Sequence, residues 1–357
     1  MNGPLLKVEN LTKHYPLGAG FLKKSIPVIR AVEDVSFSVE TGETLCIVGE
    51  SGCGKSTVAR LLMRLVEPTG GRVLIDGTDI ASLKKEALHA WRRRMQMVFQ
   101  DPYSSLNPRL TAGKIITEPV ENFERLSQKQ RNALAAQLLR KVGMSPEMMH
   151  RLPSELSGGQ RQRLGIARAL SLNPSLIIAD EAVSALDVSV QAQILNLLLD
   201  LQRQMGIAFV FISHDLGVVE HIAHRVAVMY LGRIVELAPS EALFAKPVHP
   251  YTEALIAAAP VPDPTRVRLD VPVEGEVPSP INPPSGCAFH PRCPLAVERC
   301  RIEVPPLVQM PDGRVVACHV RAPATDTPAE PVIVGDHPLY RVQRSETHSA
   351  RASRVHG

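Results

Sequence analysis

Residues 43–65 read ETLCIVGESGCGKSTVARLLMRL, and this stretch decides the fold. The four apolar residues 45–48 predict a buried strand, and an apolar helical pattern begins at Lys55. Between them, residues 49–56 match the pattern GxxxxGK[ST] in the required order of strand, loop and helix. We therefore expect an α/β domain in which a buried strand leads into a phosphate-binding loop, called here the phosphate loop.

The phosphate loop has the chemistry that a nucleotide needs. Its glycines let the backbone wrap a phosphate with N–H groups pointing inward, and the helix N-terminus adds a favourable dipole. Lys55 is expected to contact the β- and γ-phosphates, and the Ser56 hydroxyl to bind Mg²⁺. A plain glycine-rich turn would leave Lys55 unexplained. The residues expected to contact the nucleotide are Gly49, Ser51, Gly52, Cys53, Gly54, Lys55, Ser56 and Thr57.

A second segment supplies acidic side chains. In PSLIIADEAVSALD, an apolar run is followed directly by Asp180 and Glu181. Such a run is a weak signal alone, because many strands end at solvent in this way. Paired with a phosphate loop, it indicates the acidic half of a nucleotide site. We expect Asp180 to hold Mg²⁺ through water and Glu181 to polarise the attacking water.

A third segment, ELSGGQRQRLGIARAL at residues 155–170, predicts a helix that follows a Ser-Gly-Gly sequence. The apolar positions that suit one buried face are Leu164, Ile166, Ala167 and Leu170. Ser157 could be only the N-cap of this helix, or the helix N-terminus could bind an anion. Local chemistry does not separate these two interpretations.

Together these motifs resemble the ATP-binding-cassette (ABC) ATPases, in the order and spacing of that family. The resemblance implies a P-loop nucleotide-binding domain with a RecA-like core and a helical signature subdomain. It also implies that LSGGQ, residues 156–160, binds the γ-phosphate of ATP held by a partner subunit. Hydrolysis would then need two subunits paired head to tail. The residues that would reach the partner's nucleotide are Ser157, Gly158, Gly159 and Gln160.

Four further residues take family roles by resemblance. Tyr15 resembles the aromatic residue on which adenine stacks, and Gln100 the glutamine that senses the γ-phosphate and the membrane partner. Asp187 resembles the D-loop residue, and His214 the switch histidine, placed directly after the β-rich run AFVFIS. A surface aromatic and a strand cap are the plain alternatives for Tyr15 and Gln100. The expected catalytic residues are Lys55, Gln100, Glu181 and His214, and the expected Mg²⁺ ligands are Ser56, Gln100 and Asp180.

Within the family, residues 6–320 look most like the ATPases of bacterial dipeptide and oligopeptide importers. QDPYSSLNPRLT, DVSVQAQILNLLLDLQ and HPYTEAL carry that character. One departure is Ala182, where this subfamily has proline, and we expect it to alter only the rate. The alternatives are the same role for another solute, such as nickel or glutathione, and an ABC ATPase that acts on DNA or ribosomes.

The resemblance also implies partners and a location. We expect two separate permease subunits, and a second ATPase that is a sister subunit rather than a second copy. A solute-binding protein outside the membrane would take part indirectly. The chain would lie peripherally on the cytoplasmic face of the bacterial inner membrane.

The composition agrees with these expectations. The 357-residue chain has a net charge of +4, which gives no sign of a protein dedicated to nucleic acid. No apolar run approaches the roughly 20 residues that a membrane-spanning helix needs, and the N-terminal residues do not resemble a secretory signal. We expect a cytoplasmic address and no nucleic-acid partner.

Proline divides the chain, because just over half of the 30 prolines lie in residues 239–311. We expect an ABC ATPase domain at residues 1–238 and a small, loop-rich C-terminal module at residues 239–320. A flexible tail should follow at residues 321–357.

Four of the six cysteines lie in the C-terminal module: Cys287, Cys293, Cys300 and Cys318. Four thiolates can hold a 4Fe–4S cluster or a tetrahedral Zn²⁺ ion, and His290 or His319 could replace a thiol at a zinc site. The spacing lacks the CxxC pair of zinc ribbons and favours neither metal. The resemblance favours a 4Fe–4S cluster, with zinc and unligated or disulfide-bonded cysteines as alternatives. A small, loop-rich module can bury little core, so we expect the site to have a structural role, with redox sensing or gating as the alternative. Nothing in the sequence places these cysteines near the nucleotide, so we expect no chemistry there.

Overall fold

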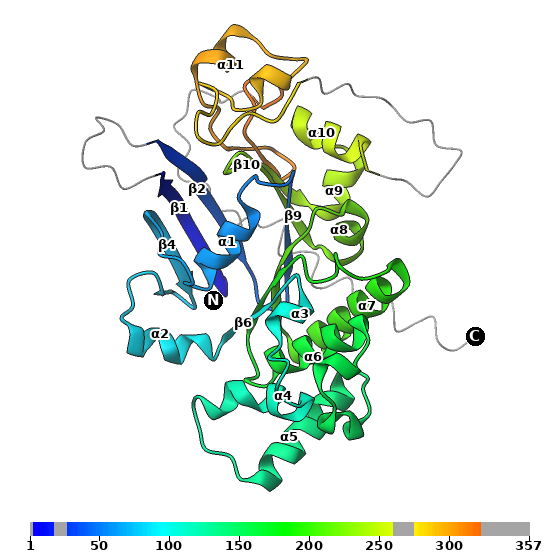
Figure 1. The fold of residues 1–357 in the computed structure, drawn as a ribbon. Helices are drawn as coiled ribbons and strands as arrows, with labels where there is room; N and C mark the ends of the chain where they lie inside the picture. The colour runs from blue at the N-terminus through cyan, green and yellow to red at the C-terminus, as the bar shows by residue number, and fades with distance from the viewer. Residues whose placement is uncertain (1–2, 18–26, 260–274, 323–357) are drawn as a thin grey trace.

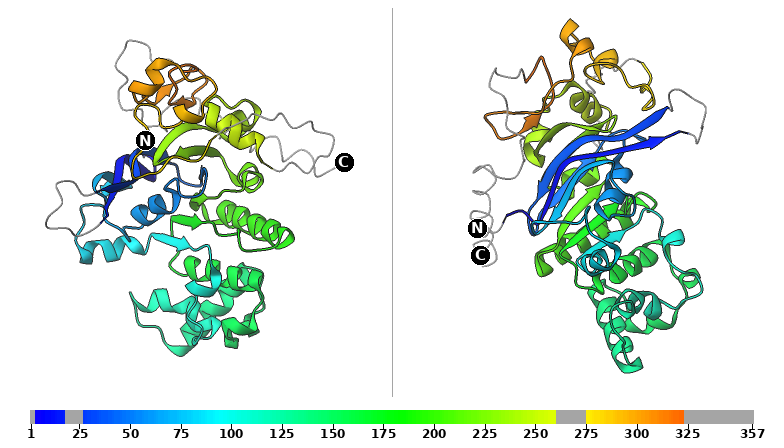
Figure 2. Two further views of the ribbon diagram at one scale, coloured as in Figure 1. Left: turned by 45° about the horizontal axis from the view of Figure 1, so that its top comes forward. Right: turned by 90° about the vertical axis from the view of Figure 1, so that its left-hand side faces the viewer.

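The fold consists of two β-sheets with a helical lobe at one end and the C-terminal module at the other (Figure 1). The computed structural model describes residues 3–17, 27–259 and 275–322. Most of the tail expected at residues 321–357 therefore lies outside the described residues. Two further views in Figure 2 show the same arrangement, with the helical lobe and the C-terminal module on opposite sides of the sheets.

The larger sheet has a parallel centre and an antiparallel edge. Strands β6, β7, β8, β3 and β9 run parallel, and β10, β12 and β11 continue the sheet antiparallel. In spatial order its strands are β11 (Val308–Gln309), β12 (Val315–Val316), β10 (Arg233–Pro239), β9 (Arg225–Tyr230), β3 (Thr44–Val48), β8 (Ala208–Ile212), β7 (Leu176–Asp180) and β6 (Met95–Val98). The strands predicted before the phosphate loop and before Asp180–Glu181 are thus β3 and β7.

The smaller sheet is antiparallel throughout and covers one face of the larger sheet. Its strands, in spatial order, are β2 (Val28–Val39), β1 (Leu6–Pro16), β4 (Gly70–Ile75) and β5 (Thr78–Asp79). Helix α1 (Lys55–Leu62) follows the phosphate loop and packs into the core between the two sheets.

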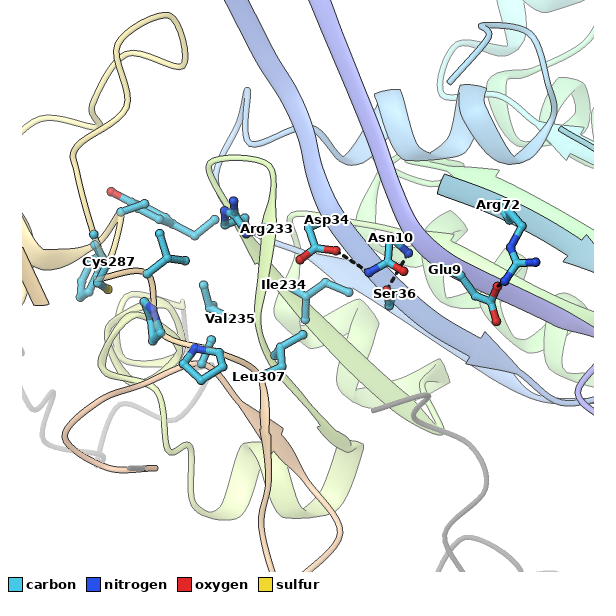
Figure 3. Close-up of a pocket in the computed structure, with 18 residues that line it drawn as sticks. Glu9, Asn10, Asp34, Ser36, Arg72, Arg233, Ile234, Val235, Cys287 and Leu307 are labelled. Atoms are coloured by element: carbon cyan, nitrogen blue, oxygen red, sulfur yellow. Dashed lines mark hydrogen bonds and ion pairs between the residues drawn. The ribbon is translucent and has the colours of Figure 1, made fainter. Parts of the chain in front are cut away.

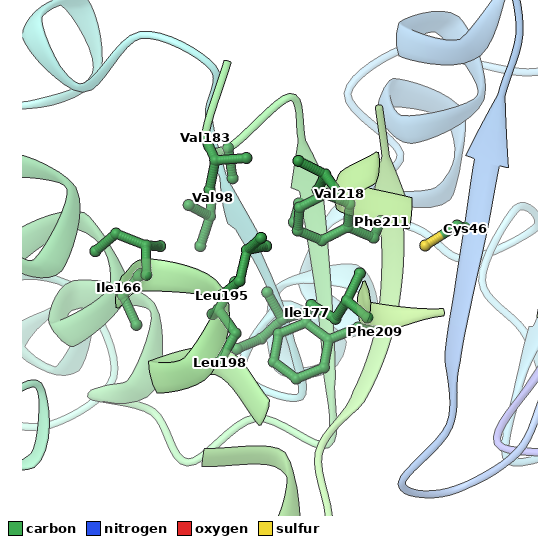
Figure 4. Packing of buried hydrophobic residues seen from close by; sticks show 14 of the residues in the cluster. Cys46, Val98, Ile166, Ile177, Val183, Leu195, Leu198, Phe209, Phe211 and Val218 are labelled. Atoms are coloured by element: carbon green, nitrogen blue, oxygen red, sulfur yellow. The ribbon is translucent and has the colours of Figure 1, made fainter. Parts of the chain in front are cut away.

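Two hydrophobic cores lie on opposite faces of the larger sheet. In β3, Leu45 and Ile47 join the core shared with α1 and the smaller sheet, whereas Cys46 and Val48 join the core shared with the helices. This alternation follows from the two-residue period of a strand, and burial on both faces is typical of parallel strands. Figure 4 shows the helical side, where Leu195 and Leu198 pack over Ile177, Phe209 and Phe211.

The helical lobe corresponds to the signature subdomain expected from the resemblance. It contains α3 (Pro102–Ser105), α4 (Ala112–Glu121), α5 (Gln128–Lys141), the short 3₁₀ segments η1 (Pro146–His150) and η2 (Pro153–Glu155), and α6 (Gly158–Leu170). The apolar face predicted for α6 is confirmed, since Leu164, Ile166, Ala167 and Leu170 are all at most 2% exposed. The long helix α7 (Val188–Met205) then packs on the larger sheet.

The C-terminal module is joined to the rest of the fold by the sheet and by the core. Strand β12 pairs with β10, so the module extends the larger sheet. Leu243, Tyr251 and Phe289 belong to the same core as the helices of the ATPase domain. The hydrophobic core thus continues across the boundary expected at residues 238/239.

The remaining helices of the described residues are α2 (Lys85–Arg92), α8 (Leu216–Ile222), α9 (Ser240–Ala245), α10 (Pro250–Ala257), η3 (His290–Arg292) and α11 (Glu298–Ile302).

Candidate nucleotide-binding site

A cleft of about 640 Å³ lies at the carboxyl ends of the parallel strands. It collects residues from β1, from the phosphate loop and from the segments that follow β6, β7 and β8. The predicted site residues that line it are Tyr15, Ser51, Gly52, Gly54, Lys55, Ser56, Thr57, Gln100, Glu181 and His214. The carboxyl edge of parallel strands is where α/β folds bind ligands.

Close backbone approach explains two glycines of the phosphate loop. A Cβ atom on Gly49 would lie 2.2 Å from the carbonyl oxygen of Met229, and one on Gly54 would lie 2.1 Å from that of Ala31. Their φ angles of +151° and +107° also disfavour any other residue. Helix α1 begins at Lys55 without a side-chain cap, which is the arrangement of an anion-binding helix N-terminus.

The Lys55 ammonium lies inside the phosphate loop. Its Nζ atom donates to the carbonyl oxygens of Gly49 at 2.7 Å and Glu50 at 2.9 Å, and it lies 3.7 Å from the sulfur of Cys53. Lys55 is only 5% exposed, so these acceptors compensate a charge that is nearly withdrawn from water. The ammonium is thereby held at the place where phosphate oxygens would arrive.

Two of the three predicted Mg²⁺ ligands, Ser56 and Asp180, touch each other. The Ser56 hydroxyl donates to Oδ1 of Asp180 at 3.0 Å. Burial raises the pKa of the Asp180 carboxyl, and the negative charge of Glu181 adds to this effect. A nearby cation would favour the ionised form of this carboxyl group, and a hydroxyl together with a carboxylate is a set of oxygen ligands suited to Mg²⁺.

Glu181 is held by two of the other predicted catalytic residues. Its Oε2 atom accepts from Nε2 of Gln100 at 2.9 Å and lies 3.3 Å from Nδ1 of His214. Its backbone has a φ of +49°, which is uncommon for a residue with a side chain, and its N–H donates to Ile212 at 3.0 Å. The next residue, Ala182, is 2% exposed and belongs to the adjoining core.

Tyr15 lines the cleft beside Ile29, with which it pairs across β1 and β2. The Lys13 ammonium lies 4.9 Å from the centre of the Tyr15 ring. The ring therefore has a position on the cleft wall and not on a remote surface, as stacking with a base requires.

The LSGGQ segment lies elsewhere. Ser157 accepts from the N–H of Gln160 at 3.3 Å, and the Gln160 side chain accepts from the N–H of Ser157 at 3.0 Å, so the two form a capping box at the start of α6. Asp187 caps α7 in a similar way, and its hydrogen bonds with Ser189 and Val190 lower its pKa. The described residues that line the cleft do not include Ser157, Gly158, Gly159, Gln160 or Asp187.

The four cysteines of the C-terminal module share one neighbourhood. Burial raises the pKa of Cys287 to about 11, and Cys300, Cys293 and Cys318 add to this shift electrostatically. The N–H of Arg321 donates to the sulfur of Cys318 at 3.4 Å, and all four thiols are free. Cys287 also borders a second cavity of about 480 Å³.

This second cavity lies between the smaller sheet and the C-terminal module (Figure 3). Polar side chains such as Asn10, Asp34 and Arg72 line it on the sheet side, and apolar ones such as Val235 and Leu307 line it toward the module.

The structure does not by itself show a metal site at these four cysteines. Within residues 3–17, 27–259 and 275–322, no group of three or more His, Cys, Asp or Glu side chains is arranged to hold a metal ion. The two histidines considered as zinc ligands face backbone carbonyls instead: Nδ1 of His290 lies 3.0 Å from the oxygen of Cys287, and Nε2 of His319 lies 2.9 Å from that of Glu303. The structure brings the four thiols into one neighbourhood, but it shows no metal-binding geometry among them in the described residues.

The C-terminal module contacts the phosphate loop, which the sequence did not predict. Arg292 donates to both carboxylate oxygens of Glu50 at 3.0 and 3.1 Å, and the Tyr251 hydroxyl accepts from the N–H of Glu50 at 2.9 Å. Pro280 lines the nucleotide cleft. Nothing in the sequence placed this region near the nucleotide, and the structure shows Arg292, Tyr251 and Pro280 beside the phosphate loop and its cleft. Arg292 and Glu50 are 242 positions apart, and no local pattern connects them.

Two family descriptions match the chain. Residues 32–184 match the family described as ABC transporter, and residues 235–300 match the family described as oligopeptide/dipeptide transporter, C-terminal region. No helix within the described segments has the length and apolar character to cross a membrane.

Curated relatives match along most of their length. A probable peptide ABC transporter ATP-binding protein, y4tS of Sinorhizobium fredii, is 81% identical over 324 residues, which cover 91% of this chain and 92% of the relative. The dipeptide transport ATP-binding protein DppF of Haemophilus influenzae is 50% identical over 317 residues, covering 89% and 97%. The oligopeptide transport ATP-binding protein AppF of Bacillus subtilis is 49% identical, covering 88% and 97%.

Solved structures share the fold. The dimeric post-hydrolysis state of the ATP-binding cassette MJ0796, bound to ADP and Pi, aligns with a TM-score of 0.59 and 32% identity, and covers 66% of this chain and 98% of that one. CbiO1 from Clostridium perfringens, part of an ABC transporter complex, aligns with a TM-score of 0.59 and 25% identity, covering 68% and 92%.

Proposed function

This chain belongs to the family of ABC transporter ATP-binding proteins that carry the oligopeptide/dipeptide transporter C-terminal region, and on that basis we propose that it powers the import of dipeptides and oligopeptides by hydrolysing ATP. The observation that carries the proposal is the cleft in which Lys55, Ser56, Gln100, Glu181 and His214 meet. The same role for another solute, such as nickel or glutathione, is the second candidate.

Phosphoryl transfer depends mostly on positioning and on stabilisation of charge. Lys55 and the N–H groups of the phosphate loop would bind the β- and γ-phosphates, and Tyr15 would stack on the adenine. Ser56, Asp180 and Gln100 would hold Mg²⁺, which neutralises charge on the phosphates when bound. The contact between Ser56 and Asp180 supports this assignment.

Glu181 is the residue that we assign to the attacking water. A carboxylate at the cleft can orient a water and accept its proton, and Gln100 and His214 hold this carboxylate in place. When nucleotide is bound, His214 would contact the γ-phosphate.

Glu181→Gln keeps the size of the side chain and removes its basicity. We expect the variant to bind ATP normally and to lose hydrolysis by at least about 100-fold, the scale of a positioned general base. Nucleotide titration and phosphate release by the transporter complex measure the two effects. Normal hydrolysis by the variant would contradict the assignment of Glu181.

We assign Ser157, Gly158, Gly159, Gln160 and Asp187 to the ATP of a partner subunit. They lie at the starts of α6 and α7 and do not line the cleft, whereas Asp180, which does not line it either, is hydrogen-bonded to Ser56 in the cleft, and this difference supports the assignment. The partner would be a sister ATPase, and the pair would act with two transmembrane permease subunits on the cytoplasmic face of the inner membrane. A solute-binding protein outside the membrane takes part indirectly, and no nucleic acid is involved.

We also propose that Cys287, Cys293, Cys300 and Cys318 hold a 4Fe–4S cluster, with Zn²⁺ as the alternative. The shared neighbourhood of the four thiols supports this, as do the backbone N–H groups of Phe289, Leu295 and Arg321 that donate to sulfur. Such bonds favour the thiolate that a metal needs.

Iron, sulfide and zinc analysis of an anaerobic preparation tests the cluster. About four irons per chain would support it, about one zinc would support the alternative, and a metal-free protein would exclude both. Cys293→Ser should remove the metal and lower the thermal stability of the C-terminal module, and unchanged stability would contradict a structural role.

We propose the division into residues 1–238, 239–320 and 321–357 as a division of function. The first unit binds ATP, the second carries the cysteines, and the third is a tail. Because the hydrophobic core crosses residues 238/239, we infer that the second unit needs the first in order to fold.

A further inference from the structure

The C-terminal module binds one residue of the phosphate loop through its side chain and its N–H, while Lys55 of the loop itself binds its carbonyl oxygen. That residue is Glu50, the second residue of the loop. Its carboxylate accepts from Arg292, its N–H donates to Tyr251, and its carbonyl oxygen accepts from Lys55. Both backbone polar groups and the side chain of Glu50 are thus engaged.

The Arg292–Glu50 pair has the geometry of a strong contact. Nη1 lies 3.0 Å from Oε2 and Nη2 lies 3.1 Å from Oε1, which is the paired arrangement in which a guanidinium matches a carboxylate. The Arg292 side chain is 10% exposed and that of Glu50 is 29% exposed, so solvent screens the pair less than a surface ion pair. Arg292 also lies 3.5 Å from the Tyr230 hydroxyl.

Tyr251 approaches Glu50 from α10. Its ring centre lies 4.6 Å from that of Tyr230 and 5.5 Å from that of Phe289, and the residue is 1% exposed. A ring packed on two sides keeps its hydroxyl in one place. The 2.9 Å hydrogen bond from the Glu50 N–H is therefore anchored in the hydrophobic core.

A third contact comes from the segment before the cysteines. The carbonyl oxygen of Pro280 accepts from the N–H of Arg30 on β2 at 3.2 Å, and Pro280 lines the nucleotide cleft together with Tyr15. The C-terminal module thus reaches the phosphate loop and the wall of the cleft.

We propose that Arg292 and Tyr251 are positioning residues that fix Glu50 and so hold the phosphate loop in its ATP-binding shape, which makes the affinity for ATP depend on the C-terminal module. The proposal rests on the ATP-binding function proposed above and adds a second region of the chain that controls it. Neither side chain is among the described residues that line the nucleotide cleft. Both act through Glu50, whose carbonyl oxygen is bound to Lys55.

The physical reason is preorganisation. A loop that is already ordered loses less conformational entropy when it binds phosphate, so it binds more tightly than a loop that must first be ordered. Loss of either contact should therefore weaken ATP binding while the catalytic groups Glu181 and His214 stay in place. The expected signature is a higher KM for ATP with a nearly unchanged kcat.

The test is a titration of the full-length chain with Mg²⁺ and a fluorescent ATP analogue. Arg292→Ala should raise the Kd about three- to thirtyfold, and Arg292→Lys should fall between wild type and Arg292→Ala, because lysine keeps the charge but not the paired hydrogen bonds. Tyr251→Phe keeps the ring and removes only the hydroxyl acceptor, and it should raise the Kd about three- to tenfold.

Arg299→Ala is the matched control. Arg299 lies in α11 of the same module and pairs at 2.7 Å with Glu303, away from the phosphate loop. This variant should bind ATP within about twofold of wild type, a difference too small to count as a lost hydrogen bond. The melting temperature of each nucleotide-free variant is measured in parallel, because a purely structural role would lower it without changing the Kd.

The outcomes separate the two claims. Equal Kd values for wild type, Arg292→Ala and Tyr251→Phe would overturn the inference alone. A wild-type chain that binds no ATP would overturn the proposed function and the inference with it. Should Arg292→Ala fail to fold, Tyr251→Phe decides the question, since it leaves the packing intact.

Discussion

Single residues in the cleft are held in arrangements that cost stability. Glu181 adopts a positive φ of +49°, and Asp180 keeps a carboxyl group at 9% exposure beside it. Such strained conformations persist where the surrounding structure holds them in place. The carbonyl oxygen of Ile212 does this for Glu181 by accepting a hydrogen bond from its N–H. A bound cation and nucleotide would relieve the cost at Asp180.

Asp180→Asn tests this balance between stability and function. Because burial raises the pKa of Asp180 in the folded protein, its ionised form opposes folding, and stability from this group falls as pH rises through that pKa. The neutral amide should make the nucleotide-free chain equally stable or about 1 kcal/mol more stable at pH 7. It should also lose most of the stabilisation by Mg²⁺-ATP.

Urea unfolding with and without Mg²⁺-ATP measures both effects. Asp200→Asn serves as the control, since Asp200 is 60% exposed and pairs only at the surface with Arg203. A destabilised Asp180→Asn chain that still responds fully to Mg²⁺-ATP would rule out this role for Asp180.

At the scale of elements, two glycines of α6 have opposite surroundings. A Cβ atom on Gly159 would lie 2.6 Å from Cγ1 of Val190 in α7, whereas one on Gly165 would meet nothing within 4 Å. The start of α6 thus approaches α7 closely, while the middle of the helix has space for a methyl group. Gly159 is tied to the packing of two helices as well as to LSGGQ.

Alanine at these two positions should therefore act in opposite directions. Gly159→Ala should destabilise the chain by about 1–3 kcal/mol, because it forces α6 and α7 apart. Gly165→Ala should stabilise it by about 0.5–1 kcal/mol, because glycine loses more entropy than alanine in a helix. Denaturant midpoints of the two variants measure the difference, and shifts of the same sign and size would contradict this view of the packing.

Helix α10 is capped by a buried histidine. Nδ1 of His249 accepts from the N–H of Tyr251 at 3.1 Å, and burial, with a smaller effect of Arg321, lowers the pKa of His249 to about 3. Between about pH 3 and 6.5, the unfolded chain binds a proton at this site that the folded chain excludes. Stability from His249 is therefore complete above pH 6.5 and falls as the pH decreases.

His249→Asn isolates this effect, because asparagine can cap the helix without titrating. From pH 7 to pH 5, His249 alone should cost the wild type about 2 kcal/mol, and the variant should lack this loss. Glu236 acts in the opposite direction, since burial raises its pKa, but it is present in both proteins. Equal pH dependence of urea unfolding in the two proteins would contradict the assignment.

Local patterns predicted the elements that carry the phosphates. Short-range patterns of apolar residues predicted three elements that the structure confirms: the strand before Gly49, the strand that ends at Asp180 and the buried face of α6. The N-cap role of Ser157 was one of two interpretations that the sequence left open, and the structure shows it, with Gln160 completing a capping box that was not predicted. The anion-binding interpretation stays a prediction, because it concerns a second subunit.

At the scale of the whole molecule, the nucleotide cleft and LSGGQ lie apart in one chain. The cleft contains the phosphate loop, Glu181 and His214, while Ser157 lies at the start of α6 in the helical lobe. We therefore predict that the chain binds ATP alone and that a second subunit completes the site, as proposed above for LSGGQ.

Ser157→Arg tests that separation. A bulky charge at the N-terminal end of α6, which we assign to the partner's ATP, should leave ATP binding by the single chain within about twofold of wild type. It should reduce hydrolysis by the assembled complex at least about 100-fold, because partner contacts that stabilise phosphoryl transfer have effects of this size or larger. Loss of ATP binding by the single chain would show that Ser157 belongs to its own cleft.

Contacts between residues far apart in the sequence could not be predicted from local sequence patterns. Glu50 and Arg292 are ordinary charged residues, and only the folded chain shows that β9, α10 and the cysteine segment meet behind the phosphate loop. The sequence grouped the four cysteines because they are close along the chain, but it gave no sign of their position relative to the nucleotide. Topology, not local pattern, decides both.

The most direct test of the proposed function is peptide uptake by vesicles that contain the permease subunits, the sister ATPase and this chain. Radiolabelled dipeptide and released phosphate are measured together, with Glu181→Gln in this chain as the comparison and nickel and glutathione as competing solutes. We expect ATP-dependent dipeptide uptake that is lost together with hydrolysis in the variant. Uptake and hydrolysis that both persist in the Glu181→Gln complex would contradict the proposed function.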